Sequence, residues 1–503
     1  MKVSTGYKKP PMLVVLAGGL GSRLAPITIC EKSSQKISGT RIYNSNAFPK
    51  PLLPLGGMIP LMQPLIDTIK SECEIDRTAM VLMYMPEDFR QYYGNSVEYF
   101  WDHQVERNVN LDTAGCILEG WNSDIRGSLD IPANYIIPSG DIRAKINTRE
   151  MYDLHVKNNA LATIALAPVQ WHEVGRFGTV VREGDIRDIN TDRFSLYLGQ
   201  KFSRILEFKE KTPHSPSNLN NASIYIISKR LFDLIVDDVD FLIDDSFPHR
   251  PNEIKLSEGR RKRLGVFSSY LKGEGLIKKG QVNPNFSDWG RHIFPDIIER
   301  PQIYGQQEAN DPEGLYGFVF DGLWSDDGTK LALWRSNMEL LAGMGGVFGN
   351  SDFSWWPKPE NIIKGNNGLP VWYGNNVKIS KSSTLLGPTI IGDNVTIEDN
   401  SIVASSVIGS GWTIAYGSEI TSSALYPDRK FLGLVADNRH LEYSVKNKQI
   451  YGSLIGSGFP KNGSVFLVPN SGAKFSFSDG IARIEKGVIV ATDSMLIIDG
   501  FIQ

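Results

Sequence analysis

The chain has 503 residues, of which 41% are hydrophobic and 22% are charged, a length that exceeds a single hydrophobic core and predicts two or more domains. Lys and Arg number 53 against 56 Asp and Glu, for a formal net charge of -3, which excludes the strongly basic surface typical of proteins that bind nucleic acid or anionic membranes. The three widely spaced cysteines, Cys30, Cys73 and Cys116, favour a reducing compartment over a disulfide framework or a zinc site. We therefore expect a cytoplasmic protein.

The first eleven residues, Met1 to Pro11, are expected to form a polar N-terminal tail. They contain lysines and precede no apolar core of the kind found in export signals. No apolar segment approaches the roughly 18 residues of a membrane span. The sequence thus predicts neither export nor a membrane anchor.

From residue 12 to residue 345 the sequence alternates short apolar runs with helix-like segments. Strands are predicted at 12–17, 78–83, 135–138, 162–168 and 223–227. Helices are predicted at 60–73, 148–158, 229–236 and 330–342. This alternation is typical of a layered α/β domain with a mixed, mainly parallel sheet, in which ligands bind beyond the carboxyl ends of the strands.

The pattern changes after residue 365, where aliphatic residues recur every six positions. Ile391 and Ile397 begin two such hexapeptides, Ile408, Ile414 and Ile420 begin three more, and the segment from Val403 to Val407 is one residue short of a hexapeptide. Hexapeptide repeats of this kind predict a left-handed β-helix, here at 370–428 after a linker at 346–369. A β-sandwich with a chance run of isoleucines is the alternative.

Two further regions contain no motif with a clear chemical role. Residues 429–503 have β-like alternation, and we expect a β-rich extension that caps the β-helix or joins subunits. Residues 238–290 are a polar excursion with a basic run at 259–264, which is a solvated face or a site for a phosphorylated effector.

The strand predicted at 12–17 leads directly into a glycine-rich loop, Ala17-Gly-Gly-Leu-Gly-Ser-Arg. Glycines at the end of a strand let backbone N–H groups approach phosphate oxygens, because no Cβ holds them apart. Leu24 stands where a dinucleotide fingerprint needs glycine, and no Lys-Ser/Thr follows as in a Walker loop. A loop that only permits tight packing is the structural alternative.

A second segment, Phe48-Pro-Lys-Pro-Leu-Leu-Pro-Leu-Gly-Gly, places Lys50 between two prolines that stiffen its backbone. Together, the glycine loop and this segment resemble the signature of the sugar-1-phosphate nucleotidyltransferases, the NDP-sugar pyrophosphorylases. Members of this family include mannose-1-phosphate guanylyltransferases and ADP-glucose pyrophosphorylases. The resemblance covers roughly residues 12–425 and implies a Rossmann-like catalytic domain followed by the β-helix.

Further segments resemble the family's motifs in the same order along the chain. They are Leu111-Asp-Thr-Ala-Gly-Cys-Ile, Ile137-Pro-Ser-Gly-Asp141, Leu206-Glu-Phe-Lys-Glu-Lys-Thr-Pro, Asn221-Ala-Ser-Ile-Tyr and Phe320-Asp-Gly-Leu-Trp-Ser-Asp-Asp-Gly-Thr. Two departures stand out: Asp112 replaces a usual glycine, and Asp327 replaces a usual aliphatic residue. The carboxylate of Asp327 is expected either to alter metal affinity or to point to solvent.

The resemblance implies a role for each matched residue. Contacts to the nucleotide would come from Ala17, Gly18, Gly19, Gly21, Ser22, Arg23, Thr113, Ala114 and Gly115. Contacts to the sugar phosphate would come from Gly178, Glu210, Lys211 and Asn221. Asp141 and Asp326 would hold Mg²⁺, and the catalytic set would be Arg23, Lys50, Asp141 and Asp326.

The implied reaction joins a nucleoside triphosphate and a hexose 1-phosphate and releases pyrophosphate. Catalysis would rest on alignment and neutralisation of charge, as phosphoryl-type transfer requires. The segments around Pro51 and Thr113 look more like the guanylyl or thymidylyl branch, so mannose 1-phosphate with GTP is preferred, and glucose 1-phosphate with ATP or a thymidylyl donor is the alternative. The expected partners are these two substrates and further copies of the chain, with neither nucleic acid nor membrane.

Three other readings remain open. The chain could be a catalytically silent, ligand-sensing paralogue, although all five expected charged residues, Arg23, Lys50, Asp141, Lys211 and Asp326, are present. An acyltransferase is less favoured because residues 371–425 contain no histidine that could act as a base. The polar insert at 29–48 is either a lid over the triphosphate or a loop without such a role.

Overall fold

The structure is a computed structural model that describes much of the chain between residues 10 and 425 and five short strands beyond them. The described residues are 10–19, 21–24, 28, 48–56, 59–82, 84–101, 113–114, 117, 131–188, 193–195, 200–238, 288–299, 301, 314–329, 332–333, 336–337, 361–414, 416–421, 424–425, 465–468, 475–478, 481–484, 489–490 and 496–499. Most of the insert at 29–48 and the basic run at 259–264 lie outside them. Within the described part of the chain, no helix combines the length and the apolar character needed to cross a membrane.

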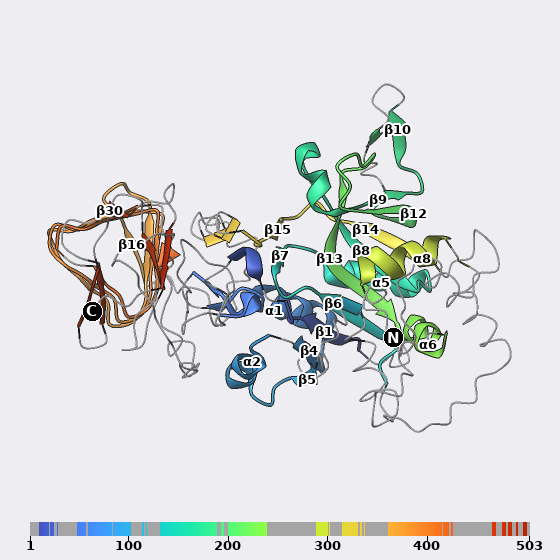
Figure 1. The fold of residues 1–503 in the computed structure, drawn as a ribbon, viewed down its shortest axis with the longest axis horizontal. Helices are drawn as coiled ribbons and strands as arrows, with labels where there is room; N and C mark the ends of the chain where they lie inside the picture. Colours follow the sequence, from blue (N-terminus) through green and yellow to red (C-terminus); the bar gives the residue numbers. More distant parts are fainter. Residues whose placement is uncertain are drawn as a thin grey trace, which may run out of the picture.

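A nine-stranded sheet forms the centre of the N-terminal region (Figure 1). Across the sheet the strands lie in the order β5-β4-β1-β6-β13-β8-β14-β12-β9. Their bounds are β1 Met12–Leu16, β4 Thr78–Leu82, β5 Glu98–Trp101, β6 Asn134–Pro138, β8 Ala162–Pro168, β9 Gly178–Arg182, β12 Phe202–Glu210, β13 Leu219–Ser228 and β14 Leu315–Val319. The predicted α/β domain is confirmed, and the strand predicted at 223–227 is the second half of the longer β13.

The expectation of a mainly parallel sheet is wrong, because half of the neighbouring pairs are antiparallel. β5, β4, β1 and β6 run parallel to one another, and β14 runs parallel to β8. In contrast, β13 is antiparallel to both β6 and β8, and β12 is antiparallel to both β14 and β9. The connection between β12 and β13 spans only 211–218, shorter than the roughly dozen residues that a parallel crossover needs.

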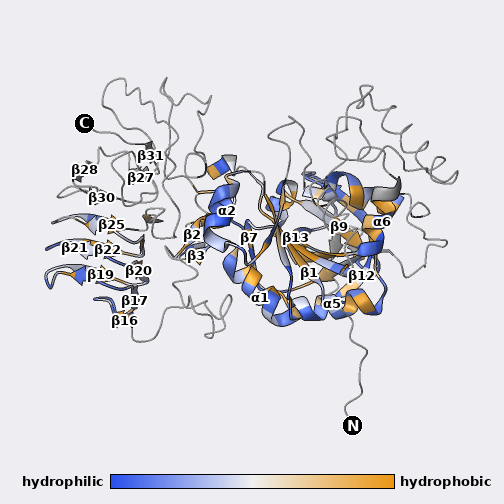
Figure 2. Cartoon of the chain, turned by 90° about the horizontal axis from the view of Figure 1, so that it is seen from below, coloured by the Kyte–Doolittle hydropathy of each residue, from blue (hydrophilic) through white to orange (hydrophobic). Residues whose placement is uncertain are grey.

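Both faces of the sheet are covered. On β1, Met12 and Val14 belong to one buried cluster, and Leu13 and Val15 belong to the other. Side chains of a strand point alternately to opposite faces, so a strand buried on both faces has a continuous apolar sequence. Figure 2 shows apolar colour on the inner strands β1 and β13 and polar colour over much of α1 and α2.

The helices are divided between these two faces. Apolar residues of α1, α2 and α5 belong to one buried cluster, and those of α6 and α8 belong to the other. The helices are α1 Gln63–Cys73, α2 Pro86–Tyr93, α5 Thr148–Lys157, α6 Lys229–Asp238 and α8 Phe294–Glu299. α1 begins three residues later than predicted, because Ile59–Pro60 (β3) pairs with Pro54–Leu55 (β2). The helix predicted at 330–342 lies largely outside the described residues.

From residue 362 onward the described strands are short and enter three sheets in turn. The first sheet contains β16 Ile362–Lys364, β17 Pro370–Tyr373, β20 Thr389–Ile391, β23 Val407–Ile408 and β26 Ala424–Leu425. The second contains β18 Lys378–Ile379, β21 Thr396–Ile397 and β24 Thr413–Ile414. The third contains β19 Thr384–Leu386, β22 Ile402–Ala404 and β25 Glu419–Thr421.

Apart from β16, neighbouring strands of these three groups are parallel and agree with the repeat in the sequence. Ile397 pairs with Ile379, eighteen residues earlier, and with Ile414, seventeen residues later. Partners are eighteen residues apart where three full hexapeptides separate them. They are seventeen residues apart where one of the three repeats is a residue short. Ile397 and Ile414 are buried, as the repeat predicts.

The C-terminal extension is rich in strands, as predicted. β29 (Ile481–Ile484) continues the sheet of β24, and β30 (Ile489–Val490) continues the sheet of β25. β28 (Phe475–Ser478) pairs antiparallel with β29, and β27 (Val465–Val468) pairs antiparallel with β31 (Leu496–Asp499). The extension therefore adds β29 and β28 to the sheet of β24 and adds β30 to the sheet of β25.

Candidate active site

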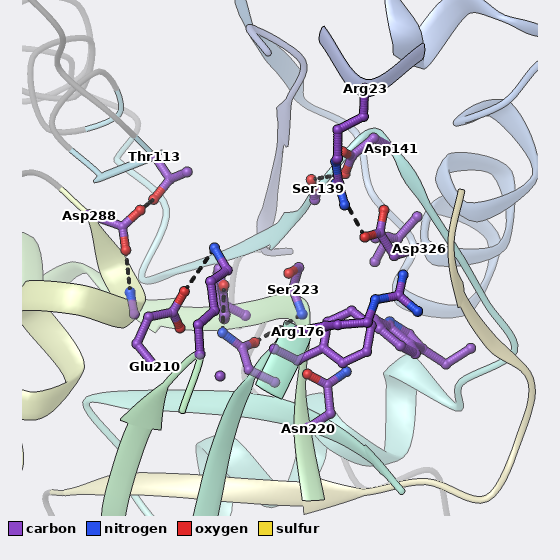
Figure 3. A pocket seen from close by; sticks show the side chains of 18 residues that line it. Arg23, Thr113, Ser139, Asp141, Arg176, Glu210, Asn220, Ser223, Asp288 and Asp326 are labelled. Carbon is purple, nitrogen blue, oxygen red and sulfur yellow. Dashed lines mark hydrogen bonds and ion pairs between the residues drawn. The ribbon is translucent and has the colours of Figure 1, made fainter. Parts of the chain in front are cut away.

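A cavity of about 530 Å³ lies at the edge of the nine-stranded sheet, beyond the end of β6 (Figure 3). Side chains from segments far apart in the sequence line it. Eight of them were predicted from the sequence: Arg23, Thr113, Asp141, Gly178, Glu210, Lys211, Asn221 and Asp326. The expectation of a ligand site at the carboxyl ends of strands therefore agrees with the position of this cavity.

One end of the cavity contains a compact cluster of charges. The buried ammonium of Lys50 donates to Asp141 Oδ2 at 2.7 Å and to Asp326 Oδ1 at 3.2 Å. Arg23 donates from Nη2 to Asp326 Oδ2 at 3.4 Å. The four residues predicted to be catalytic are thus joined in one network.

Burial and charge act in opposite directions in this network. Burial disfavours the ammonium of Lys50, but the carboxylates of Asp141 and Asp326 outweigh that effect and raise the pKa of Lys50. Burial likewise opposes ionisation of Asp141, but Lys50 and the hydroxyl of Ser139 outweigh it and lower the pKa of Asp141. Both groups are therefore charged at neutral pH.

Two short strands bring the two aspartates together. Ser139, Gly140 and Asp141 follow β6, and Ser139 Oγ donates to Asp141 Oδ1 at 2.5 Å. The next strand, β7 (Ile142–Ala144), pairs antiparallel with β15 (Trp324–Asp326), so that Ile142 lies opposite Asp326. This pairing places the two carboxylates side by side, although the residues are far apart in the sequence.

The donor set fits a divalent cation. The two carboxylates already hold one cationic group between them, the Lys50 ammonium, and carboxylate oxygens are the ligands that Mg²⁺ prefers. Among the described residues no cluster of three or more Asp, Glu, His or Cys side chains occurs. Two carboxylates are enough when substrate phosphates supply further oxygens, as is usual for Mg²⁺ sites in phosphoryl-transfer enzymes.

Arg23 is the part of the glycine loop that reaches the cavity. It lies in the 3₁₀ turn Ser22–Leu24, and 60% of its side chain is exposed. A Cβ on Gly328 would lie 2.5 Å from Arg23 Nη2 and 2.8 Å from Asp326 Oδ1, so a larger residue there would require the guanidinium and the carboxylate to shift. The exposed fork of donors can therefore bind an anionic ligand from the cavity side.

The remaining predicted residues of the nucleotide site do not line the cavity. Ala17, Gly18, Gly19, Gly21 and Ser22 belong to the loop before Arg23. Ala114 is buried beside Thr113, which does line the cavity, and Gly115 lies outside the described residues. The nucleotide contacts of these residues remain predictions.

A second polar group lies on another wall of the cavity. Lys211 pairs with Glu210 at 3.1 Å, and about half of the Lys211 side chain is exposed. Gly178 faces Glu210, and a Cβ there would lie 2.5 Å from Glu210 Oε2. Lys211 and Ser223 both have left-handed backbones, with φ of 49° and 58°, a strained conformation that is found preferentially at functional sites.

The sequence analysis assigned no role to Asp288 and its neighbours, which lie at the end of the predicted polar excursion at 238–290. Asp288 accepts hydrogen bonds from the N–H groups of Gly290 and Arg291 and thereby caps the turn that leads into α8. Thr113 Oγ1 donates to Asp288 Oδ2 at 3.2 Å, and Trp289 Nε1 donates to the carbonyl oxygen of Thr113 at 3.0 Å. An Asp-x-Gly pattern just before an apolar helical segment was the available signal for this cap.

Asp327, the second departure from the family motif, does not point to solvent. It is completely buried and accepts from Arg143 at 2.5 and 3.2 Å. The hydroxyls of Ser325 and Ser336 donate to its Oδ1 at 2.8 and 2.6 Å. Arg143 and Ser325 lie opposite each other on β7 and β15, so this ion pair links the two strands that position Asp141 and Asp326.

Comparisons with known proteins point to nucleotidyltransferases. Residues 38–256 match the family model for nucleotidyl transferases. The glucose-1-phosphate adenylyltransferase of Clostridioides difficile (strain 630) is 24% identical over 440 residues, which cover 84% of this chain and 86% of that protein. The glucose-1-phosphate adenylyltransferase of Acetivibrio thermocellus is 23% identical over 503 residues, which cover 96% of this chain and 91% of that protein.

A solved structure of UDP-glucose pyrophosphorylase complexed with UDP-glucose also matches the chain. The TM-score is 0.40 with 15% identity, and the match covers 65% of this chain and 97% of the other.

Proposed function

Because the chain belongs to the sugar-1-phosphate nucleotidyltransferase family, we propose that it joins a nucleoside triphosphate to a hexose 1-phosphate and releases pyrophosphate. One observation supports this most strongly. Arg23, Asp141 and Asp326 line the same cavity as the separate pair of Glu210 and Lys211 (Figure 3), and the buried Lys50 binds both aspartates from behind the cavity wall. The cavity can therefore hold two phosphorylated substrates at once, with a cationic side chain available to the phosphate groups of each.

In the proposed reaction an oxygen of the sugar phosphate attacks the α-phosphorus of the triphosphate. A new P–O bond forms as the bond from the α-phosphorus to the bridging oxygen of the β-phosphate breaks, and the electron pair leaves with pyrophosphate. Lys211 anchors the sugar phosphate, and Arg23 binds the phosphates that depart. Such transfer needs alignment and neutralised charge rather than an enzyme nucleophile.

Lys50 and the two aspartates act at the reacting phosphates. Asp141 and Asp326 would hold Mg²⁺, which when bound supplies positive charge to the phosphate oxygens. Lys50 is kept protonated by the same carboxylates and donates from a buried, fixed position. Its position between the aspartates also limits their repulsion before substrates bind.

We further propose glucose 1-phosphate and ATP as the substrates. The named relatives are glucose-1-phosphate adenylyltransferases, and this agrees better with the alternative reading of the sequence than with mannose 1-phosphate and GTP.

The C-terminal strands are proposed to form a left-handed hexapeptide β-helix through which copies of the chain associate. The repeated pairing at seventeen or eighteen residues supports the β-helix. Ile362, Ile363 and Leu369 expose apolar side chains near its first strand, which supports association. Light scattering of the purified chain tests this, and a monomer at all micromolar concentrations would contradict it.

The substrate proposal is tested by a matrix of assays. Pyrophosphate release is measured with Mg²⁺ for each common nucleoside triphosphate combined with glucose, mannose and galactose 1-phosphates. We expect the highest kcat/KM with ATP and glucose 1-phosphate. A higher value with GTP and mannose 1-phosphate would overturn the choice of substrates, and silence of the folded protein in every combination would favour a ligand-sensing paralogue.

A further inference from the structure

Asn220 on β13 is a buried polar residue without partners. Its residue surface is 0% exposed, and neither Oδ1 nor Nδ2 has a hydrogen bond within the described structure. Among the described residues whose buried polar side-chain atoms lack a hydrogen bond, Asn220 alone lines the cavity. Buried amides are normally satisfied, so an amide left unpaired beside a ligand cavity calls for an explanation.

The next residue, Asn221, differs because its side-chain amide already has hydrogen-bond partners. Asn221 also lines the cavity, but its Nδ2 donates to Tyr225 Oη at 3.1 Å and its Oδ1 accepts from the Ser223 N–H at 2.9 Å. These two bonds hold the bulge of β13, where the pairing with β8 shifts between Asn221 and Tyr225. The amide of Asn221 is thus already engaged by the protein, whereas that of Asn220 is not.

The strands beside Asn220 do not supply a partner. Asn220 lies opposite Ala167 on β8 and opposite Thr179 on β9. Alanine has no polar side-chain atom, and the hydroxyl of Thr179 lies 2.5 Å from that of Ser215. These two strands therefore leave the amide unpaired, and the cavity that Asn220 lines is where a ligand could supply a partner.

The hydrogen-bonding groups of the Asn220 amide indicate which kind of ligand group it can bind. An amide offers a carbonyl acceptor and an NH₂ donor on the same plane, which complements a sugar hydroxyl or a pair of neighbouring hydroxyls that both donate and accept. A phosphate could accept from Nδ2 but would meet the lone pairs of Oδ1, and Lys211 is available for it elsewhere on the wall. A neutral polyhydroxylated ring therefore fits better than a phosphate.

We propose that Asn220 binds hydroxyl groups of the hexose ring and determines which hexose 1-phosphate the enzyme accepts. This inference rests on the proposed function and adds to it a residue that the family motifs did not indicate. Because Asn220 has no surface open to bulk water, small side-chain rotations on the cavity wall open the contact as the sugar enters, as is common on binding. A site built to pair with a hydroxyl rejects analogues that lack it.

The test uses the full-length Asn220→Leu variant, which keeps the number and branching of the side-chain heavy atoms and removes both polar atoms. We expect its KM for the hexose 1-phosphate to rise at least about 10-fold, with the KM for the triphosphate unchanged within about two-fold. Its discrimination between the preferred hexose 1-phosphate and the matching deoxy analogues should fall by a similar factor. The melting temperature should stay the same or rise, because an unpaired buried amide has been removed.

Thr78→Val is the matched control. Thr78 Oγ1 is also buried without a hydrogen bond in the described structure, but it lies on β4 and does not line the cavity. We expect this variant to keep both KM values while its melting temperature stays the same or rises. A shared change in KM for both variants would indicate a general effect of altering the core and would overturn the proposal.

Other outcomes separate the inference from the function on which it rests. An active Asn220→Leu enzyme with unchanged KM and unchanged sugar discrimination would overturn the role of Asn220 alone. Silence of the wild-type chain in all substrate combinations would instead overturn the proposed function. If Asn220→Leu does not fold, Asn220→Ser replaces it, and an unchanged sugar KM in that variant would contradict the proposal equally.

Discussion

Asp141 combines a negative charge, two side-chain hydrogen-bond partners and partial exposure to the cavity. It is bound by Lys50 and Ser139, and about a third of its side chain faces the cavity. Replacement by Asn preserves the shape but removes the charge that holds Lys50 and would hold Mg²⁺. We expect Asp141→Asn to lose about 10³-fold in kcat, the scale seen when a preorganised charged contact to the transition state is removed.

The assay for Asp141→Asn is magnesium-dependent pyrophosphate release at saturating substrates, with circular dichroism to establish that the variant is folded. A folded variant that keeps near-wild-type activity would refute the assigned role. Asp153→Asn is a suitable control, since Asp153 is an exposed residue of α5 paired only with nearby Arg149 in the described structure. That control should retain full activity.

His155 shows how burial shapes a residue outside the site. It is fully enclosed on α5, where its Nδ1 lies 2.8 Å from Thr163 Oγ1 and its Nε2 lies 3.2 Å from Asn134 Oδ1. An amide oxygen can only accept, so Nε2 bears the proton of a neutral ring. Burial lowers the pKa of His155 to about 3.

This lowered pKa predicts a loss of stability in acid. Below about pH 6.5 the unfolded chain takes up a proton at His155 that the folded chain refuses until about pH 3, so folding stability falls as the pH falls through this window. Between pH 7 and pH 5 the contribution of His155 to the loss should be about 2 kcal/mol. Urea unfolding of the wild type and His155→Gln at both pH values measures it, and equal pH dependence of the two would contradict the assignment.

At the scale of elements, the link between β7 and β15 determines the geometry of the charged cluster. The ion pair of Arg143 and Asp327 lies between these strands with almost no exposure, and Ser325 and Ser336 complete the hydrogen bonds of the carboxylate. Removing one partner leaves an uncompensated buried charge. We expect Arg143→Leu or Asp327→Val alone to cost about 3–5 kcal/mol of unfolding free energy.

The double variant Arg143→Leu/Asp327→Val should recover most of this loss, because two apolar side chains of suitable size can replace a buried pair at little cost. Urea unfolding of the four proteins forms a double-mutant cycle. Costs that simply add in the double variant would contradict a direct coupling between the two residues.

Strand positions were predictable from the sequence where apolar runs are continuous, as on β1 and β8, because such strands are buried on both faces. The direction of β13 was not predictable from its own composition, since apolar runs are alike in parallel and antiparallel strands. The short connection between β12 and β13 was the relevant signal. The parallel C-terminal strands were predictable because every sixth residue must be aliphatic to fill their shared core.

Across the whole molecule, short sequence motifs pointed to most of the charged residues of the cavity, but not to the hydrogen bonds and ion pairs that join them. Lys50 lies 91 residues from Asp141 and 276 from Asp326, so nothing in the local sequence predicts that one ammonium binds both. Asp288 and Asn220 were missed for related reasons: the first lies at the end of the polar excursion at 238–290, and the second differs from Asn221 in having no side-chain hydrogen bond within the described structure. Such differences arise from tertiary packing, which local patterns do not encode.

We propose that the nucleotidyl group, and not the terminal phosphate, is transferred to the sugar phosphate in this cavity. It is tested most directly by incubating the protein with Mg²⁺, glucose 1-phosphate and ATP labelled at either the α- or the γ-phosphorus. We predict that the α-label appears in the nucleotide sugar and the γ-label in pyrophosphate. Release of the γ-label as inorganic phosphate, with no α-label joined to the sugar, would contradict the account.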